Sequence, residues 1–410
     1  MAPQPTPLYF DNNATTRVAP EVLEEMLPLL TDLYGNPSSM HRFGGQVGRL
    51  LARARERVAA GLGCSPEEIV FTSCGTESDN TALHSAVTAN PGKKHLVTTR
   101  VEHPAVLNVA QHLEKRGYDV TWLGVDSQGL LDLDELRRAL RDDTALVSVM
   151  FANNETGTIY PMADIAALCK ERGVLLHTDA VQAVGKVPMD LATLGVDYLA
   201  LSGHKLHAPK GVGALYVRRG APLRPFMLGG HQERGRRAGT ENMASIVALG
   251  KAVELATAHI ADENTRVRAL RDRLERGLLE SIPDARRNGH ADQRLPNTTN
   301  ISFKYVEGEA ILLLMDELGI CASSGSACTS GSLEPSHVLR ALGVPFTFAH
   351  GSIRFSLSRY NTEAEVDTVL REMPGIIARL RAMSPFREGA DAPDGGACAC
   401  SCATPGGGTH

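Results

Sequence analysis

One lysine of this chain follows an apolar segment directly, where a charged side chain is not expected. Lys205 comes just after the apolar segment 198–203. Because burying an ammonium group costs free energy, two interpretations are open. The stem could cover apolar surface while the charge reaches water, or Lys205 could be a desolvated amine that forms a Schiff base. Only nine of the 42 Lys and Arg residues are lysines, and several others lie beside charged residues, which is typical of a solvated face.

A single cysteine lies within a segment that has no large side chain. Residues 322–332 are Ala, Ser, Gly and Thr around Cys328. Nothing here can anchor the backbone by burial, so we expect the segment to move. Structural cysteines prefer apolar neighbours, as Cys169 has. The pattern therefore favours an exposed nucleophile at Cys328, and a flexible linker with an incidental thiol is the alternative.

Polar residues at the ends of two other apolar segments could bind a cofactor ring. Asp179 ends the segment 173–179, where a carboxylate would face the crevice that binds ligands in α/β proteins. Such an acid can keep the pyridine nitrogen of pyridoxal phosphate protonated, and Gln182 could reach the ring hydroxyl. A helix N-cap is a compatible role for Asp179. His103 could lie over a bound ring, although a lone histidine is more often structural.

Small and hydroxyl residues predict an anion site. The segment 72–78 (TSCGTES) lies between an apolar run and a predicted helix, and N–H groups at a helix N-terminus favour phosphate. An ordinary helix cap has the same composition. Ser202 and His204, which flank the lysine segment, could donate to the same phosphate. Arg354 lies in a strand-like segment, where its guanidinium could bind an amino-acid carboxylate or simply be exposed.

Strand-like and helix-like segments alternate through the first two thirds of the chain. Strands are predicted at 94–100, 119–125, 144–150, 173–179, 198–203 and 212–218, and helices at 46–61 and 164–172. This order predicts a mostly parallel sheet with helices on both faces, and the glycines at 211–213 allow one antiparallel pairing. Beyond residue 264, short strands (300–305, 352–357) and helices (308–318, 362–381) predict a smaller α+β domain. Residues 386–410 have almost nothing to bury and are expected to be disordered.

The composition excludes several classes of protein. Hydrophobic residues are 43%, charged residues 22% and the net charge is −5, values that fit a globular chain and exclude collagen and coiled coil. No apolar run approaches the ~18 residues of a membrane span, and the first residues lack the features of a secretory signal. We therefore expect a cytoplasmic enzyme with reduced cysteines. The slightly acidic charge argues against nucleic acid as a partner.

Motifs spread from residue 8 to about 384 resemble one family. They are LYFDNNATT (8–16), YGNPSS (34–39), EHPAV (102–106), NNETG (153–157), HTDAVQ (177–182), SGHK (202–205), RAGTEN (237–242), SSGSACTSGS (323–332) and GSIRFS (351–356). With these motifs the chain is similar to the cysteine desulfurases, class V pyridoxal-phosphate enzymes of the fold-type I aminotransferase superfamily. The stretches HKLHAPKGVG, GGHQERGRRAGTEN and SSGSACTSGSLEPSHVLRA are most similar to the nitrogen-fixation, NifS-type branch.

The resemblance implies an α/β fold of two domains. The large domain, residues 13–260, would hold pyridoxal phosphate on a mostly parallel seven-stranded sheet between helices. The small α+β domain would combine residues 1–12 with 261–385 and carry the Cys328 loop, followed by the cysteine-containing tail 386–410.

The resemblance also implies roles for the candidate residues. Lys205 would bind the cofactor as a Schiff base and move the substrate's α-proton, His103 would stack on the ring, and Cys328 would accept sulfur. Asn154 and Arg354 would bind the substrate carboxylate or the edge of the cofactor. The residues implied to contact the cofactor are Gly75, Thr76, His103, Asn154, Asp179, Gln182, Ser202, Gly203, His204, Lys205 and Thr240. Thr240 would come from the partner subunit of a homodimer.

The implied reaction converts L-cysteine to L-alanine and leaves a persulfide on Cys328. An iron–sulfur scaffold protein, of the kind that serves nitrogenase, would accept this sulfur, so Cys328 would transiently contact a nascent cluster. A selenocysteine lyase or another pyridoxal-phosphate lyase or aminotransferase is the alternative within the enzymes. A non-catalytic metal carrier is a different class, and it would use Cys398, Cys400 and Cys402, which match no motif of the family. These three could bind a soft metal or relay sulfur, or they could belong to an unselected terminus.

Overall fold

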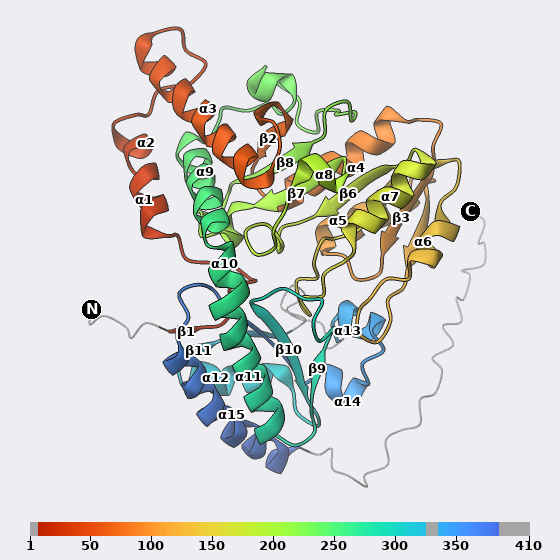
Figure 1. The fold of residues 1–410 in the computed structure, drawn as a ribbon, viewed down its shortest axis with the longest axis vertical. Coiled ribbons are helices and arrows are strands. Elements are labelled where there is room, and N and C mark those ends of the chain that lie inside the picture. The colour runs from red at the N-terminus through yellow and green to blue at the C-terminus, as the bar shows by residue number, and fades with distance from the viewer. Residues whose placement is uncertain (1–6, 325–334, 385–410) are drawn as a thin grey trace, which may run out of the picture.

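The computed structural model describes residues 7–324 and 335–384, and a seven-stranded sheet forms the centre of its upper part (Figure 1). The strands in spatial order are β2 (Ile69–Thr72), β8 (Gly213–Val217), β7 (Tyr198–Ser202), β6 (Leu175–Asp179), β5 (Thr144–Ser148), β3 (His95–Thr99) and β4 (Asp119–Leu123). The strands from β7 to β4 are parallel, and β8 is antiparallel to β7 and β2. The mostly parallel sheet predicted from the sequence, with its antiparallel pairing near residues 211–213, is confirmed.

Helices cover both faces of this sheet because successive strand residues point to opposite sides. Tyr198 of β7 lies in one apolar cluster with residues of α4 (Gly75–Ala89) and α5 (Pro104–Glu114). Leu199, the next residue, lies in the cluster of the opposite face. That cluster includes residues of α1 (Pro20–Met26), α2 (Pro28–Thr31), α3 (Arg42–Leu62), α6 (Leu133–Ala139), α7 (Met162–Arg172), α8 (Leu191–Leu194) and α9 (Met243–Ala258). The sheet is thus buried on both sides, as parallel sheets are.

A smaller, four-stranded antiparallel sheet lies in the lower part of the molecule (Figure 1). Its order is β12 (Ser323–Ser324), β13 (Ser352–Ser356), β10 (Thr298–Phe303) and β9 (Ala285–Asn288), and it packs with α11 (Arg268–Ser281), α12 (Gly308–Asp316) and α15 (Glu363–Met383). β1 (Leu8–Tyr9) pairs in parallel with β11 (Ile320–Cys321), and Phe10 joins the apolar core of this lower part. Two short helices, α13 (His337–Ala341) and α14 (Phe346–Ala349), precede β13. The domain boundaries at residues 12 and 260 remain predictions.

One bent helical segment connects the upper and lower parts. α9 is followed by α10 (Ile260–Asp262), a π-helical turn at Glu263–Val267 and then α11, with a bend of 50° after α9. In the part of the chain that the structure describes, no single helix is long and apolar enough to cross a membrane, and only this bent pair passes by length and composition. α9 is largely buried, and it packs against α3 and α1.

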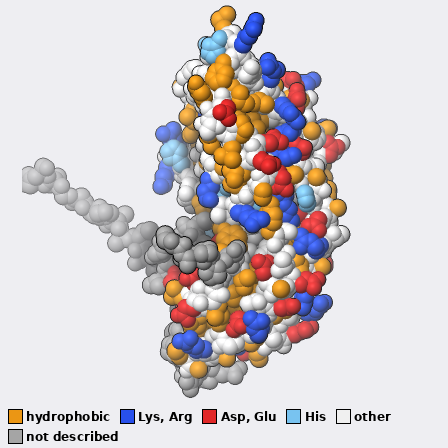
Figure 2. Space-filling view, turned by 90° about the vertical axis from the view of Figure 1, so that its left-hand side faces the viewer, with side chains coloured by type: hydrophobic (Ala, Val, Ile, Leu, Met, Phe, Trp, Pro, Cys, Tyr) orange, Lys and Arg blue, Asp and Glu red, His pale blue; other side chains and the backbone are white. Residues whose placement is uncertain are grey.

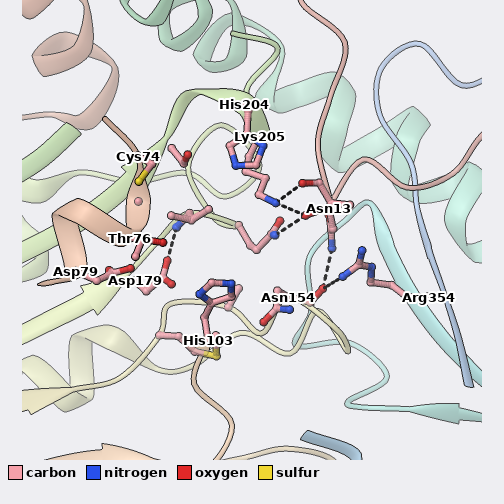
Figure 3. A pocket seen from close by; sticks show the side chains of 17 residues that line it. Asn13, Cys74, Thr76, Asp79, His103, Asn154, Asp179, His204, Lys205 and Arg354 are labelled. Carbon is pink, nitrogen blue, oxygen red and sulfur yellow. Dashed lines mark hydrogen bonds between the residues drawn. The ribbon is translucent and has the colours of Figure 1, made fainter. Parts of the chain in front are cut away.

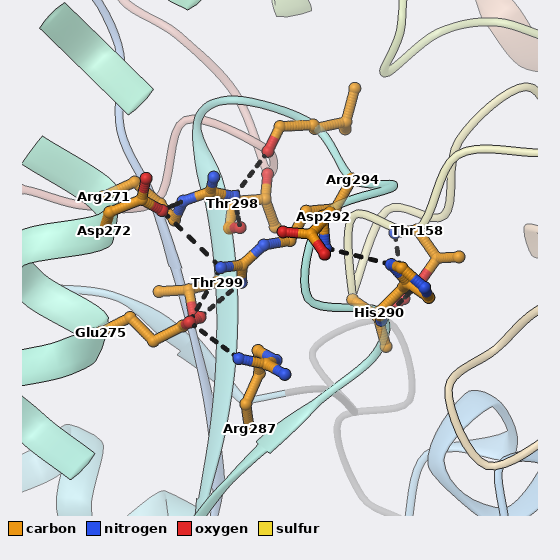
Figure 4. Close-up of polar contacts among 12 residues, drawn as sticks. Thr158, Arg271, Asp272, Glu275, Arg287, His290, Asp292, Arg294, Thr298 and Thr299 are labelled. Carbon is orange, nitrogen blue, oxygen red and sulfur yellow. Dashed lines mark hydrogen bonds and ion pairs between the residues drawn. The ribbon is translucent and has the colours of Figure 1, made fainter. Parts of the chain in front are cut away.

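A buried ion cluster joins α11 to the residues around the start of β10 (Figure 4). Glu275 of α11 accepts hydrogen bonds from Arg294 Nη2 at 2.8 Å, Arg287 Nη1 at 3.2 Å and Thr299 Oγ1 at 2.6 Å. Burial raises the pKa of Glu275, but the hydrogen bonds and charges of these partners outweigh burial and hold the pKa below its ordinary value. Arg271, one turn earlier, donates to the carbonyl groups of residues 295 and 298. The cluster therefore positions β10 relative to α11.

The face shown in Figure 2 has a band of apolar side chains over its upper part, on the side where α1 and α2 lie in Figure 1. Leu23 of α1 is 44% exposed, Leu27 between the two helices 48% and Leu30 of α2 59%. Val22 and Leu29, from the opposite side of the same helices, are buried in the core. The two helices are therefore anchored through one side and present leucines on the other.

Candidate active site

The carboxyl ends of the parallel strands border a cavity of about 280 Å³ (Figure 3). Among the residues that line it are these candidates from the sequence: Gly75, Thr76, His103, Asn154, Asp179, Gln182, Ser202, His204, Lys205 and Arg354. They come from segments far apart in the chain, and one of them, Arg354, comes from the smaller sheet. The structure therefore gathers most of the predicted site, while the role of each residue remains a prediction.

Three predicted site residues are not placed in this cavity. Gly203 and Thr240 are not among the described residues that line it. Gly203 is buried in the turn after β7, where a Cβ would lie 2.8 Å from Val212 Cγ1, and Thr240 is exposed. Cys328, together with Cys398 and the rest of the tail, lies outside the described residues.

Lys205 ends a short turn, η2 (Gly203–Lys205), that follows β7. Its Nζ donates hydrogen bonds to the main-chain carbonyl groups of Asn13 at 2.5 Å and Ala14 at 2.7 Å. The amine therefore lies in the cavity wall, where the N-terminal segment holds it (Figure 3). This position supports the interpretation of Lys205 as an amine that meets a ligand.

Asp179 is the last residue of β6, and its carboxylate faces the cavity. Its Oδ1 accepts a hydrogen bond from the Val181 N–H at 2.9 Å. Burial raises the pKa of Asp179, whereas the neighbouring His103 and Lys205 lower it. A buried carboxyl of this kind stays ionised when a cation lies beside it, and a protonated ring nitrogen is such a cation.

A second buried acid, Asp79 of α4, lines the same cavity beside Asp179 (Figure 3). Burial raises the pKa of Asp79, and the charge of Asp179 raises it further. His177 Nε2 lies 3.2 Å from Asp79 Oδ1, and burial lowers the pKa of His177 to about 3. Asp79 was not predicted from the sequence as a site residue, although its place three residues after Thr76, at the start of the predicted helix, was a usable signal.

His103 is the N-cap of α5 as well as a cavity residue. Its Nδ1 accepts a hydrogen bond from the Ala105 N–H at 3.2 Å. Burial lowers the pKa of His103, whereas the negative charge of Asp179 raises it by less. A neutral ring whose Nδ1 is an acceptor carries its proton on Nε2, so His103 presents one N–H group. The structural role weighed for this histidine thus coexists with its place in the cavity.

The start of α4 forms a cradle with little space and unpaired polar groups. A Cβ on Gly75 would lie 2.6 Å from Val181 Cγ2, so only glycine fits. Ser202 Oγ is buried and has no hydrogen-bond partner among residues 7–324 and 335–384. Burial lowers the pKa of His204 to about 4, so its ring is neutral. A helix N-terminus with unpaired donors fits a phosphate group.

Two more buried polar atoms of cavity residues, Gln182 Oε1 and Arg354 Nε, have no partner within the described chain. Leaving a buried polar atom unpaired costs free energy, so both indicate a ligand. Gln182 could pair with a ring hydroxyl and Arg354 with a carboxylate. Together with the cradle at Gly75 and the acid Asp179, the residues present fit pyridoxal phosphate with an amino acid beside it.

Asn13 is a central contact of the site, and it was not predicted from the sequence. Besides Lys205, its carbonyl accepts a hydrogen bond from Gln182 Nε2 at 3.0 Å. Its side chain donates to the Asn154 carbonyl at 3.3 Å and to Thr298 Oγ1 at 2.9 Å. Asn13 lies in the motif at 8–16, but carbonyl groups carry no sequence signal, so this role was not predictable.

A second buried lysine was also missed. Lys186 is 7% exposed, and its Nζ donates to the Gln182 carbonyl at 3.2 Å. Burial lowers the pKa of Lys186 to about 8. It is not among the described residues that line the cavity, so Lys205 is the lysine that a ligand there would meet.

The described residues on both sides of the Cys328 segment contact residues that line the cavity or adjoin its lining in the chain. On one side Ser323 pairs with Arg354 in the small sheet. On the other side Ser336 Oγ donates to Glu155 Oε2 at 2.6 Å, and His337 Nε2 lies 3.0 Å from the Glu102 carbonyl. Both flanks of residues 325–334 are therefore attached beside the cavity.

The described residues hold four cysteines, Cys64, Cys74, Cys169 and Cys321, and all are free thiols. Burial raises the pKa of Cys64 and Cys169 to about 12, which is typical of unreactive structural thiols. Within the described ranges, no group of three His, Cys, Asp or Glu residues is placed to hold a metal ion.

A family model matches most of this chain. The model, described as aminotransferase class-V, matches residues 8–369, and the chain belongs to this family. The chain is 59% identical over 383 residues to the cysteine desulfurase NifS of Azotobacter vinelandii, covering 93% of this chain and 95% of that protein. It is 63% identical over 380 residues to a cysteine desulfurase of Nostoc sp., with 93% and 95% covered.

Solved structures are similar over most of the chain. A structure described as a NifS-like protein superposes with a TM-score of 0.86 at 42% identity, covering 91% of this chain and 100% of the other. A structure described as SspA in complex with cysteine has a TM-score of 0.77 at 37% identity, covering 86% and 99%.

Proposed function

We propose that this chain is a cysteine desulfurase that takes sulfur from L-cysteine, releases L-alanine and carries the sulfur on Cys328. The observation that carries the proposal is one cavity with an amine at Lys205 and a buried guanidinium at Arg354. An amino acid fits between them, because its carboxylate matches the guanidinium and its α-carbon can face the amine. The desulfurase names of the relatives support the same reaction.

We infer that the cofactor is pyridoxal phosphate. Lys205 would hold it covalently, Asp179 would contact its ring nitrogen, and Gln182 would bind its ring hydroxyl. The phosphate would lie at the cradle, where the proposed contacts are Gly75, Thr76, Ser202 and His204. When bound, pyridoxal phosphate supplies an electron sink for negative charge at the substrate's α-carbon.

The residues around the substrate would orient it and move its protons. Arg354 and Asn154 would hold the carboxylate, so that the α-carbon faces Lys205. The Nζ of Lys205 would take the α-proton, and the Nε2–H of His103 would lie over the ring and handle protons. Because these side chains would already be held in place before the reaction, less entropy would be lost in bringing the reacting groups together.

The sulfur transfer balances with Cys328 as the only co-reactant. The Cys328 thiolate attacks the substrate sulfur, an S–S bond forms and the C–S bond breaks. The carbon fragment gains the electron pair and a proton and becomes L-alanine, while the sulfur is oxidised to a persulfide. Cys328, which lies outside the described residues, would meet the substrate first and a sulfur acceptor afterwards.

We propose an iron–sulfur scaffold as the sulfur acceptor, for nitrogenase cluster assembly. The name of the relative from Azotobacter vinelandii, cysteine desulfurase NifS, supports this class of partner. Cys328 would contact the nascent cluster as the sulfur leaves. We also propose a homodimer, in which the exposed Thr240 reaches the phosphate of the partner subunit.

The test is incubation of the pyridoxal-phosphate-loaded protein with L-cysteine. We expect alanine release and a persulfide on Cys328 in equal amounts during the first turnover. Cys328→Ala should lose both products and retain the visible absorbance of the cofactor, whereas the matched variant Cys64→Ala should retain both. Full alanine and sulfide release in Cys328→Ala would exclude the proposed function, and activity with selenocysteine alone would favour a selenocysteine lyase.

A further inference from the structure

Arg354, the proposed carboxylate ligand, is already paired with an acid of the chain. Its Nη2 donates to Asp11 Oδ1 at 2.8 Å, and its Nη1 donates to the Asn154 carbonyl at 3.1 Å. The Arg354 side chain is 6% exposed and the Asp11 side chain 17%. Its Nε has no partner among the described residues, so the guanidinium is held at two nitrogens and unpaired at the third.

The backbone places Asp11 where it can reach this guanidinium. Asp11 forms an isolated parallel bridge with Ser356, two residues after Arg354 on β13. The Asn12 N–H donates to the Ser356 carbonyl at 3.1 Å, and the Ser356 N–H donates to the Phe10 carbonyl at 2.7 Å. The N-terminal segment is therefore fixed along the strand that carries Arg354.

We propose that Asp11 is a positioning residue that orients the Arg354 guanidinium to receive the substrate carboxylate. This inference rests on the proposed function. An arginine side chain has many rotamers, and fixing two of its nitrogens before binding removes part of the entropic cost of recognition. Asp11 also supplies the counter-charge that a buried guanidinium needs in the absence of substrate.

A competing role for Asp11, as a resident carboxylate that blocks Arg354, predicts the opposite result. If Asp11 blocked the site, its removal would tighten the binding of amino acids. The contacts favour positioning, because Asp11 contacts Nη2 and leaves Nε free. A guanidinium has five N–H groups, so further donors remain for a ligand carboxylate.

The same N-terminal segment also contacts the proposed catalytic lysine. The carbonyl groups of Asn13 and Ala14 accept from Lys205 Nζ, two and three residues after Asp11. A substitution at Asp11 could therefore disturb Lys205, and the test must separate the carboxylate from the amine. A pair of ligands that differ only in the carboxylate does so.

The experiment compares the binding affinity of L-alanine with that of ethylamine, which lacks the carboxylate. Binding is measured by the change in visible absorbance of the pyridoxal-phosphate-loaded protein. We expect Asp11→Ala to weaken L-alanine binding by about tenfold, the effect of losing a hydrogen bond to a charged group, with ethylamine binding unchanged. Asp11→Asn keeps an oxygen acceptor and should weaken L-alanine binding less. KM for L-cysteine should rise while kcat changes little.

The control is Asp367→Ala, which removes an exposed acid paired with Arg273 and should change the binding of neither ligand. Equal weakening of L-alanine and ethylamine, no weakening, or tighter L-alanine binding in Asp11→Ala would overturn the inference. If Asp11→Ala does not fold, the test uses Asp11→Asn instead. An affinity ratio between L-alanine and ethylamine that is the same in Asp11→Asn as in the wild type would then overturn the inference. Failure of the proposed function would be seen in a different measurement, because the wild-type protein would then release no alanine from L-cysteine.

Discussion

Lys205 and Asn13 lie 192 residues apart in the chain, yet Lys205 Nζ donates to the Asn13 carbonyl at 2.5 Å. The Asn13 side chain donates to Thr298 Oγ1 of the small sheet, and its N–H donates to Ser356 Oγ. The N-terminal segment therefore connects the lysine turn of the large sheet with two strands of the small one. The site depends on this contact between the two sheets.

Lys205→Ala should abolish covalent attachment of the cofactor and lower turnover by about 10²–10⁴-fold, because the variant has no amine to move the α-proton. Borohydride reduction of the wild-type protein, followed by peptide mapping, should label Lys205. Lys210→Ala, an exposed lysine nearby, serves as the control and should keep full labelling. A label on the buried Lys186 instead would contradict the assignment.

Gly75→Ala should weaken pyridoxal phosphate binding, since the new Cβ would lie 2.6 Å from Val181 Cγ2 and displace the start of α4. Equilibrium dialysis of the cofactor measures the effect. Adding Val181→Ala removes the clash and should restore most of the affinity. Gly92→Ala, where a Cβ meets nothing within 4 Å, should bind the cofactor like the wild type. Unchanged affinity in Gly75→Ala would argue against the phosphate cradle.

Asp179→Asn should lower turnover by about 10²-fold or more, because a neutral amide cannot hold a proton on the ring nitrogen. The cofactor should remain bound through Lys205 and the cradle, with a shifted absorbance spectrum. Turnover and the spectrum are measured together. Asp164→Asn, on an exposed position of α7, should change neither property. Wild-type turnover in Asp179→Asn would remove this acid from the mechanism.

Glu275→Gln should lower the free energy of unfolding by about 3 kcal/mol, because it removes the buried charged partner of Arg294 and leaves only the half-exposed Asp272, 3.7 Å away. The folded-state pKa of Glu275 lies below the ordinary value, so its stabilisation is present at neutral pH and is lost as the pH falls through the folded pKa. The difference in unfolding free energy between wild type and variant, measured by urea unfolding, should therefore become smaller below about pH 4.

The control for the ion cluster is an exposed pair. Asp134 and Arg137 have side chains 69% and 55% exposed, so Asp134→Asn should change stability by about 0.5 kcal/mol or less. If Glu275→Gln lowers the unfolding free energy by no more than Asp134→Asn does, or by an amount that does not change with pH, the buried cluster contributes no net stability.

The local sequence was sufficient to predict the elements that carry the main groups of the site. Two neighbouring strands of the large sheet are apolar runs that end at polar residues, β6 at Asp179 and β7 at Ser202, and parallel strands place these ends at one edge of the sheet. The position of Lys205 just after such a run, and the glycine at the start of α4, follow from the same local pattern. Hydrophobic periodicity is a short-range property, so it can be read without the fold.

Other contacts depend on segments that are distant in sequence. Arg354 comes from the small sheet, and only the folded chain places it beside Asp11 and Asn154. The same applies to Lys186, whose sequence neighbours do not indicate that it is buried.

The sequence by itself therefore determined the class of fold and predicted Lys205, Asp179 and the cradle at Gly75 as site residues, because each belongs to one strand, helix or turn. Only the tertiary structure decided which carbonyl groups hold Lys205 and which acid holds Arg354. The physical reason is that main-chain carbonyls are the same at every position, and an ion pair across two sheets leaves no pattern in either segment. Distance and direction in the folded chain select these partners, as they select Asn13 for Lys205.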